Sequence, residues 1–484
     1  MPERNPLLAS LHLKLAAMRA AQERGVKNDT AMVLGMIKAL EKAEADAAKK
    51  AEKVEPETVE EVDEVQAVEP VRSPIRLCLF DLDDTLLQTS DLDRYRGQEN
   101  VGKTDLNFAY RGNLRMAYGD PAGRYIYTPE HHVELRAAYP EMKWGVFTRS
   151  PRLYAQTLLA HAYPGLTWDA IVAFEDVRHT KPHGDGIWAA IEQCDVKYVD
   201  EVALVGDDKI DVQAAYQGGC WSILDQSSWV ERPWASQRYW AMEKLPDAVI
   251  TRPSDLVKVL GHPKGFWPDL EYLSDSEAEM AGRVLRIDKI NHFFPRPDNA
   301  YVSIQCLGRL FGEYPELGPR RKWHALTAEI HAHKEAKKFP SAWVEAIRRA
   351  IRRAAIGRDC VVTVIPFKPG RPPRLEALLD QVRASEEQSP IIGGMVYQYE
   401  RALLAFREGA VSSHGQHLNR DERFANVEQN LYVAQPERAK GKTVIVIDDV
   451  ITTGATLLWA HRYLTRAGAR SVSCISLAKA VGIG

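Results

Sequence analysis

At 484 residues the chain is longer than one hydrophobic core usually supports, so we expect about two to four domains. Its composition, with 45% hydrophobic and 27% charged residues and a net charge of −3, is that of an ordinary globular protein, and its six cysteines lack the paired spacing of a zinc site or a disulfide framework. No apolar run reaches the roughly 18 residues of a membrane span, and Met1 to Ala16 lacks the pattern of a signal peptide, so we expect a cytoplasmic protein without membrane contact.

The first 73 residues separate into two parts. Residues 1–42 carry apolar side chains at helical spacing and predict a small helical segment. This segment either serves as a docking or oligomerisation module or packs on the following domain. Residues 43–73 predict an acidic, solvated linker, because the stretch 41–70 holds eleven acidic residues against four lysines.

From residue 74 the pattern changes to short apolar runs that alternate with helical stretches. This alternation predicts a mostly parallel, doubly wound α/β sheet over residues 74–262. The expected strands cover residues 77–80, 144–147, 170–174, 202–205 and 248–251.

Two carboxylates follow the first of these strands directly. Asp81 and Asp83 stand two residues apart after the run Leu77–Phe80. The carboxyl end of a strand in an open α/β sheet is where ligands bind. One carboxylate there can attack phosphorus while the other protonates the leaving oxygen, so the pair suits hydrolysis of a phosphomonoester.

Three later segments, each near a predicted strand end, add what this chemistry still needs. Thr148 offers a hydroxyl to a phosphoryl oxygen, and Lys181 offers a cation that offsets developing charge. The run Gly206–Asp211 supplies carboxylates suited to a hard metal ion, namely Asp207, Asp208 and Asp211.

These four motifs, in this order over about residues 74–262, resemble the haloacid dehalogenase (HAD) superfamily. The resemblance implies a Rossmann-like fold in which Asp81 is the nucleophile that forms an aspartyl-phosphate and Asp83 is the general acid and base. It also implies that Thr148 and Lys181 hold the phosphoryl group. Because Asp83 supplies a second acid, a phosphatase is favoured over a dehalogenase.

The same resemblance implies a Mg²⁺ site. The ion would lie between Asp81, the backbone carbonyl of Asp83 and Asp207, with Asp208 or Asp211 assisting.

A cap inserted between the motifs is expected to select the substrate. Only about residues 88–127 are available for it, which is short for a full helical cap and leaves the site open to larger substrates. The segment mixes basic and aromatic residues, which either face a nucleotide or a single-stranded end, or form an exposed loop with a few packed aromatics.

A connector over residues 263–300, rich in proline and aromatic residues, is expected to precede a second doubly wound α/β domain over residues 301–484. The expected strands of the second domain cover residues 360–365, 443–447 and 471–477.

In this second domain a buried strand runs into two acids and a hydroxyl-rich loop that opens a helix. Asp448 and Asp449 are placed for the two hydroxyls of a ribose. Backbone amides at the helix start, together with threonine hydroxyls, form an anion cradle for its 5′-phosphate. The cradle residues are Thr452, Thr453, Gly454 and Thr456. This signature resembles the phosphoribosyl pyrophosphate (PRPP) site of type I phosphoribosyltransferases.

A narrower resemblance, carried by Gly415–Val427 and Ala467–Lys479, is to ComF-like phosphoribosyltransferases and covers about residues 300–484. The family has a pyrophosphate-binding loop, for which the candidate is Ile365–Arg371, where Lys368 and Arg371 could meet pyrophosphate. The arginine, glycine, phenylalanine, asparagine run expected shortly afterwards is missing, so phosphoribosyl transfer and mere binding of PRPP or a nucleotide stay open as alternatives.

Two pairs of arginines, Arg348 with Arg349 and Arg352 with Arg353, share one face of a predicted helix. They predict either a nucleic-acid contact or a solvated basic face.

Together the two resemblances imply a bifunctional enzyme of nucleotide or nucleoside-like metabolite chemistry, in which a Mg²⁺-dependent phosphatase stands beside a PRPP-binding phosphoribosyltransferase. Its ligands would be PRPP or another ribose phosphate, and a phosphorylated small molecule or nucleotide. The alternative is a nucleic-acid-associated or defence-linked protein, in which the second domain senses a nucleotide or DNA and the first removes phosphate from a nucleic-acid end.

Overall fold

The computed structural model describes residues 74–229, 237–275, 286, 288–293, 301–355, 359–367, 372–389, 396–408 and 419–483. All of them belong to one compact unit, Pro70–Gly484. The predicted helical segment of residues 1–42 and the linker of residues 43–73 lie outside the described residues. Of the helices in these ranges, none is long and apolar enough to cross a membrane.

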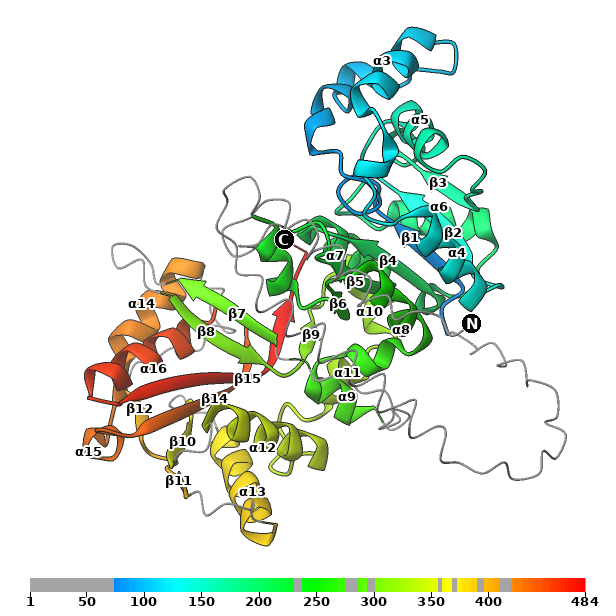
Figure 1. The fold of residues 1–484 in the computed structure, drawn as a ribbon. Coiled ribbons are helices and arrows are strands. Elements are labelled where there is room, and N and C mark those ends of the chain that lie inside the picture. The colour runs from blue at the N-terminus through cyan, green and yellow to red at the C-terminus, as the bar shows by residue number, and fades with distance from the viewer. Residues whose placement is uncertain are drawn as a thin grey trace, which may run out of the picture. The chain divides into compact units, whose positions relative to one another are not determined.

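The first sheet, as far as the chain is described, has six parallel strands in the order β3-β2-β1-β4-β5-β6 (Figure 1). The order reverses at β1, so the ends of β1 and β4 flank the switch point where doubly wound sheets bind ligands. The strands are β1 (Leu77–Phe80), β2 (Lys143–Phe147), β3 (Ala170–Val172), β4 (Val202–Gly206), β5 (Trp221–Asp225) and β6 (Ala248–Ile250).

Strand β1 is buried along its whole length, as expected for a central parallel strand with helices on both faces. Two of the predicted strands differ from the observed ones. Strand β5 was not among the predictions, and the predicted strand 170–174 stops at Val172, because Phe174 begins the short helix η4 (Phe174–Asp176).

The helices of the first domain connect these strands in chain order. Helix α7 begins after Asp208, whose side chain caps its first turn, and ends at Gly219, where a φ of 89° favours glycine. The helices are α4 (Pro129–Ala138), α5 (Arg152–Ala162), α6 (Asp185–Cys194), η5 (Val199–Glu201), α7 (Lys209–Gly218), η7 (Gln237–Lys244), η8 (Pro253–Asp255) and α8 (Leu256–Gly261).

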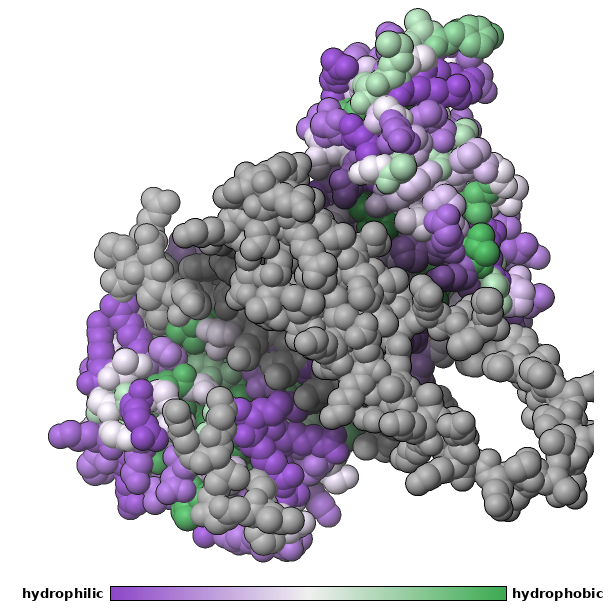
Figure 2. All heavy atoms as spheres, viewed as in Figure 1, coloured by the Kyte–Doolittle hydropathy of each residue, from purple (hydrophilic) through white to green (hydrophobic). Residues whose placement is uncertain are grey.

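The segment predicted as a small cap, residues 88–127, lies between β1 and β2. It contains η1 (Ser90–Tyr95), η2 (Gln98–Asn100), α3 (Phe108–Tyr118) and η3 (Pro121–Gly123), and α3 contacts α5 (Figure 1). The rings of Tyr95 and Tyr110 pack edge to face with centroids 5.8 Å apart, so these aromatics belong to the cap's own packing. Figure 2 shows hydrophobic residues at the tip of the cap, where Leu106, Phe108 and Met116 are exposed.

The second sheet follows the order β11-β10-β14-β15-β8-β7, and β9 also pairs with β15. Its pairs are parallel except β7 with β8. A separate antiparallel pair joins β12 to β13. The strands are β7 (Asp288–Phe293), β8 (Tyr301–Cys306), β9 (Arg309–Phe311), β10 (Cys360–Val364), β11 (Tyr397–Tyr399), β12 (Leu404–Phe406), β13 (Leu431–Val433), β14 (Thr443–Ile451) and β15 (Ser471–Val481).

The predicted connector of residues 263–300 requires correction, because part of it is regular structure. Strand β7 lies in it and forms an edge of the second sheet. Its sequence, Asp-Lys-Ile-Asn-His-Phe, is mostly polar, so it lacks the apolar run by which a buried strand is recognised. Further helices of this half are η9 (Pro263–Phe266), α9 (Asp269–Ser274), η10 (Pro315–Leu317), α10 (Gly318–Arg321), α11 (Ala325–Ala332), α12 (Ser341–Ala355), α13 (Arg374–Gln388), α14 (Arg420–Asn430), α15 (Pro436–Ala439) and α16 (Ala455–Arg466).

Four fully buried charged residues connect the two halves of the chain, and we call Asp247, Glu271, Arg309 and Arg320 the junction cluster. Arg309 pairs with Asp247 at 2.8 Å and donates from Nε to Glu271 at 2.7 Å, while Arg320 also pairs with Asp247. Arg309 further donates to the hydroxyl of Tyr216 in α7, at 2.8 Å. Each buried charge therefore has an opposite charge beside it, the condition under which charges are tolerated away from water.

Candidate functional site

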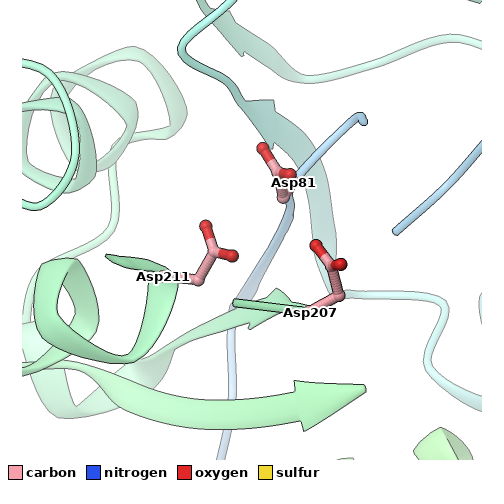
Figure 3. Close-up of side chains that lie close together, drawn as sticks. All are labelled: Asp81, Asp207 and Asp211. Atoms are coloured by element: carbon pink, nitrogen blue, oxygen red, sulfur yellow. The ribbon is translucent and has the colours of Figure 1, made fainter. Parts of the chain in front are cut away.

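Three carboxylates meet at the carboxyl ends of the first sheet. Asp81 follows β1 and Asp207 follows the neighbouring parallel strand β4, while Asp211 lies in the first turn of α7. One oxygen from each lies within 4.8 Å of the others, and Figure 3 shows the three side chains pointing toward a common space. Oxygen-only ligands at this spacing suit a hard divalent cation such as Mg²⁺.

Lys181 is buried beside two of these carboxylates. Its Nζ lies 2.6 Å from Asp81 and 2.7 Å from Asp211. Burial by itself would lower the pKa of Lys181, but Asp211 and Asp81 outweigh it and raise the pKa above its usual value. The side chain is therefore a fixed positive charge at the site.

The three carboxylates carry more negative charge than their protein partners offset. Burial raises the pKa of Asp81 to about 7, although Lys181 opposes the shift, and Asp211 and Asp83 add to it. Burial also raises the pKa of Asp207, against the opposing effect of Arg238, which lies 2.9 Å away. A divalent cation would supply the missing positive charge, so the residues present fit Mg²⁺.

The side chain of Asp83 stands apart from these three carboxylates and is held by hydroxyl groups. It accepts hydrogen bonds from Thr89 at 2.7 Å and Tyr154 at 2.8 Å, and a long one from Thr148 at 3.5 Å. Ser150 donates to it as well. The expected metal contact of Asp83 was through its backbone carbonyl, and its carboxylate is not one of the three grouped ligands.

Asp208 and Asp211 were alternatives for the assisting ligand, and the geometry separates them. The Asp208 carboxylate accepts the amide of Lys209 and so serves as the cap of α7. Asp211 is one of the three grouped carboxylates, and its second oxygen accepts the Asp208 amide at 3.1 Å. The structure thus brings Asp211 to the site and turns the Asp208 side chain to the helix start.

Two arginines at this site did not emerge as site residues from the sequence. Arg238, in η7, pairs with Asp84 at 2.6 Å and with Asp207 at 2.9 Å. Arg96, in the cap, lies 3.4 Å from Asp83. Both line a cavity of about 390 Å³ together with the predicted residues. Arg96 belonged to the basic set noted in the cap, whereas Arg238 follows the last motif without any pattern around it.

The second site is a cavity of about 1130 Å³ at the end of β14. It is lined by the acid pair, Asp448 and Asp449, and by the four cradle residues Thr452, Thr453, Gly454 and Thr456. Gly454 precedes α16 with a φ of 70°, a backbone conformation that glycine adopts without strain. The predicted pyrophosphate contacts Lys368 and Arg371 lie outside the described residues.

Strand β14 is longer than the predicted strand 443–447, since it continues through both acids to Ile451. The neighbouring strand β15 is equally extended, and its register places Ser476 beside Asp448 and Lys479 beside Ile451. The acids are therefore fixed by sheet pairing, although the sequence reads as a loop after Ile447.

Three basic side chains border this cradle and were not predicted as part of it. Arg374 of α13 pairs with Asp449 at 2.6 Å, and it lies shortly after the candidate pyrophosphate loop, where the expected family run is missing. Arg423 donates to the Thr452 hydroxyl at 3.2 Å, and Lys479 donates to the Thr452 carbonyl at 2.9 Å. The cavity therefore offers cations beside an acid pair, as a sugar phosphate requires.

Comparison with known proteins assigns both halves. A model of the haloacid dehalogenase-like hydrolases matches residues 134–224, and a model of the phosphoribosyl transferase domain matches residues 412–481. Pyrophosphatase PpaX of Bacillus mycoides is 27% identical over 220 residues, which is 40% of this chain and 99% of that protein. The chain is an enzyme that joins a HAD-type phosphatase domain to a phosphoribosyltransferase domain.

Solved structures also resemble the phosphatase domain. A predicted phosphoglycolate phosphatase from Haemophilus somnus is 17% identical, covers 39% of this chain and 98% of that one, and has a TM-score of 0.26. CbbY from Rhodobacter sphaeroides, solved with phosphate, is 18% identical, covers 31% and 86%, and has a TM-score of 0.25.

The arginine-rich helix of the transferase domain is α12, and each of its four arginines has an acidic partner within the fold. Arg348 is buried and pairs with Glu386 of α13 at 2.9 Å, while Arg349 pairs with Glu345 at 2.9 Å. The other two arginines also face acids, Arg352 facing Glu386 and Arg353 facing Asp269. Arg348, Arg352 and Arg353 connect α12 to α13 and α9, whereas the pair of Arg349 with Glu345 lies within α12 itself.

Proposed function

We propose that the phosphatase domain hydrolyses phosphate esters with Mg²⁺ held by Asp81, Asp207 and Asp211. The observation that carries this proposal is the convergence of these carboxylates with Lys181 at the carboxyl ends of adjacent parallel strands. Mg²⁺, when bound, would offset the charge of the phosphoryl group and of the carboxylates.

The residues around the phosphoryl group have separate tasks in this mechanism. An Asp81 oxygen attacks phosphorus while the bond from phosphorus to the leaving oxygen breaks, and Asp83 gives that oxygen a proton. Lys181, fixed 2.6 Å from Asp81, offsets the charge that develops on the phosphoryl oxygens. Asp83 then takes a proton from the water that splits the aspartyl-phosphate, which releases phosphate and restores Asp81.

For the transferase domain we propose binding of PRPP followed by phosphoribosyl transfer. Asp448 and Asp449 orient the ribose hydroxyls, and the loop before α16 receives the 5′-phosphate at a helix start. A nucleophile then bonds to C1 of the ribose while the bond from C1 to the pyrophosphate oxygen breaks. The acids act by position and charge, since the transition state is cationic at the sugar.

The two proposed reactions can follow one another on the same molecule. The transferase domain would join a base or another nucleophile to phosphoribose, and the phosphatase domain would then remove the 5′-phosphate from the product. Loss of the phosphate makes the two successive reactions hard to reverse. Incubation of the full chain with Mg²⁺, PRPP and a panel of bases tests this, with phosphate and pyrophosphate measured separately. If the release of pyrophosphate does not depend on an added base, phosphoribosyl transfer is refuted. If the Asp81→Asn variant still releases phosphate, Asp81 is not the nucleophile.

A second candidate substrate for the phosphatase domain is inorganic pyrophosphate. Its support is the 27% identity to a protein described as a pyrophosphatase, together with a transferase domain in the same chain whose proposed reaction yields pyrophosphate. The Asp81→Asn variant separates the two candidates. The variant accumulates both products of transfer, whereas wild type consumes pyrophosphate if pyrophosphate is the substrate and consumes the 5′-phosphorylated product if the ester is.

A further inference from the structure

A third cavity, of about 280 Å³, lies where the phosphatase domain meets the end of the transferase sheet. Helix α7 and η7 contribute Lys209 and Lys244, and the end of β15 contributes Lys479. Gln213 of α7 donates to the carbonyl of Ile483 at 3.4 Å, so the chain just beyond β15 is held against α7. The cavity thus belongs to both domains, and it shares the end of β15 with the transferase cavity.

The cavity is strongly basic for its size. Three lysines and one acid, Glu243, are the charged residues among its described lining, which leaves an excess of two positive charges. Burial lowers the pKa of Lys479 and of Lys244, and Lys479 and Lys209 lower the pKa of Lys244 further. Lysines that repel one another in a partly buried space are stabilised by an anion bound between them.

The same cavity adjoins both reaction sites. Lys479 and its three following residues, to Gly482, line the large transferase cavity as well, and Lys479 donates to the carbonyl of Thr452 in the cradle. On the other side, Lys209 directly follows Asp208, which lines the phosphatase cavity. An anion bound by the lysines would therefore lie next to the transferase cradle. One of these lysines is also the next residue in the chain after a residue that lines the phosphatase cavity.

We propose that this lysine cavity binds inorganic pyrophosphate that leaves the transferase site and holds it for the phosphatase domain. The proposal rests on pyrophosphate as the phosphatase substrate. Transfer breaks the bond between ribose C1 and oxygen and releases pyrophosphate. Hydrolysis then breaks one bond between phosphorus and the bridging oxygen, and water supplies the replacing oxygen, which gives two phosphates. The chain thereby consumes the product that would reverse the transfer.

Titration calorimetry with inorganic pyrophosphate tests the cavity in the full chain. The background is Asp81→Asn, so that the ligand is not consumed, and the test variant is Lys244→Gln, which touches neither reaction site. We expect one pyrophosphate fewer per chain, or affinity at that site lower by about tenfold to a hundredfold, the effect of removing one charge-assisted hydrogen bond. Lys244→Arg, which keeps the charge, should restore binding.

The matched control is Lys258→Gln, which removes the same charge from an exposed position on α8. Identical isotherms for Lys244→Gln and Lys258→Gln would overturn the proposal. So would inorganic phosphate binding as tightly as pyrophosphate, because the site would then be a general oxyanion site. Melting curves confirm that each variant is folded.

Failure of the substrate assignment would look different. In that case wild-type protein with Mg²⁺ would leave pyrophosphate intact while hydrolysing p-nitrophenyl phosphate, whatever the calorimetry of the cavity shows. A different outcome would be equal rates of pyrophosphate hydrolysis in wild type and Lys244→Gln, together with unchanged binding. That result would support pyrophosphate as the substrate and refute the role of the lysine cavity.

Discussion

Lys181 is the residue on which the phosphatase site depends most, because it is buried against both Asp81 and Asp211. Its replacement by methionine keeps much of the volume and removes the charge. We expect kcat/KM for p-nitrophenyl phosphate to fall at least about a hundredfold, the scale seen when a fixed charge is removed from a transition state. The control is Lys143→Met, whose ion pair with Asp169 is largely exposed. Equal activity of the two variants would contradict the role of Lys181.

His132 makes a separate prediction about stability. It is fully buried against the rings of Tyr163 and Trp168, and neither of its ring nitrogens has a hydrogen-bond partner among the described residues. Burial lowers its pKa to about 3, and the nearby Arg136 and His131 contribute to the shift. The folded protein therefore holds His132 neutral across a range in which the unfolded chain protonates it.

The direction in which stability changes with pH follows from this difference in pKa. Between the unfolded pKa of about 6.5 and the folded value of about 3, the unfolded state binds more protons, so stability falls as pH falls, by at most about 1.4 kcal/mol per pH unit. Wild-type protein should lose more of its melting temperature than His132→Phe when the pH is lowered from about 7.5 to about 5. Parallel losses in both proteins would show that His132 is not responsible.

At the scale of single elements, the sequence was most informative where side chains are apolar throughout. Strands β1, β4 and β10 are fully buried and were predicted from continuous apolar runs. The mostly polar edge strand β7 and the three-residue strands β9 and β11 carry no such signal. Their pairing depends on neighbours distant in the chain, which no local pattern records.

The same limit applies to the site residues. Asp81, Thr148, Lys181 and Asp207 were predicted because they follow strand ends in a familiar order. Arg238 and Arg374 were missed, since each sits in a segment without regular pattern and meets its acid only through the fold.

The contact between α12 and α13 allows a test at this scale. Arg348 is buried, pairs with Glu386, and donates to the Ser389 carbonyl at 2.7 Å, so Arg348→Ala leaves buried acceptors unpaired. We expect a loss of about 3–5 kcal/mol, as for one partner of a buried ion pair. Arg383→Ala, on the exposed face of α13, should cost at most about 1 kcal/mol. Thermal melting of both variants measures the difference, and similar shifts would exclude a structural role for Arg348.

For the whole molecule, the junction cluster decides whether the two domains behave as one. Burial would raise the pKa of Asp247, but Arg309 and Arg320 lower it below its usual range, so its carboxylate stays charged. Arg309→Met removes a positive charge from beside the buried carboxylates of Asp247 and Glu271, and should destabilise the protein by about 3–5 kcal/mol. Calorimetric melting should show a lower and broader transition, while the exposed variant Arg252→Met should melt like wild type. An unshifted Arg309→Met transition would mean that the cluster does not contribute to stability.

The junction cluster also constrains how this chain can change over generations. Asp247 comes from the phosphatase side, and the two arginines that neutralise it come from the chain that leads into the transferase sheet. A recombinant that exchanged one domain for a distant homologue would bring together a buried acid and an unmatched neighbour. We therefore expect positions 247, 309 and 320 to vary together among fused relatives, and to vary independently where either domain occurs alone.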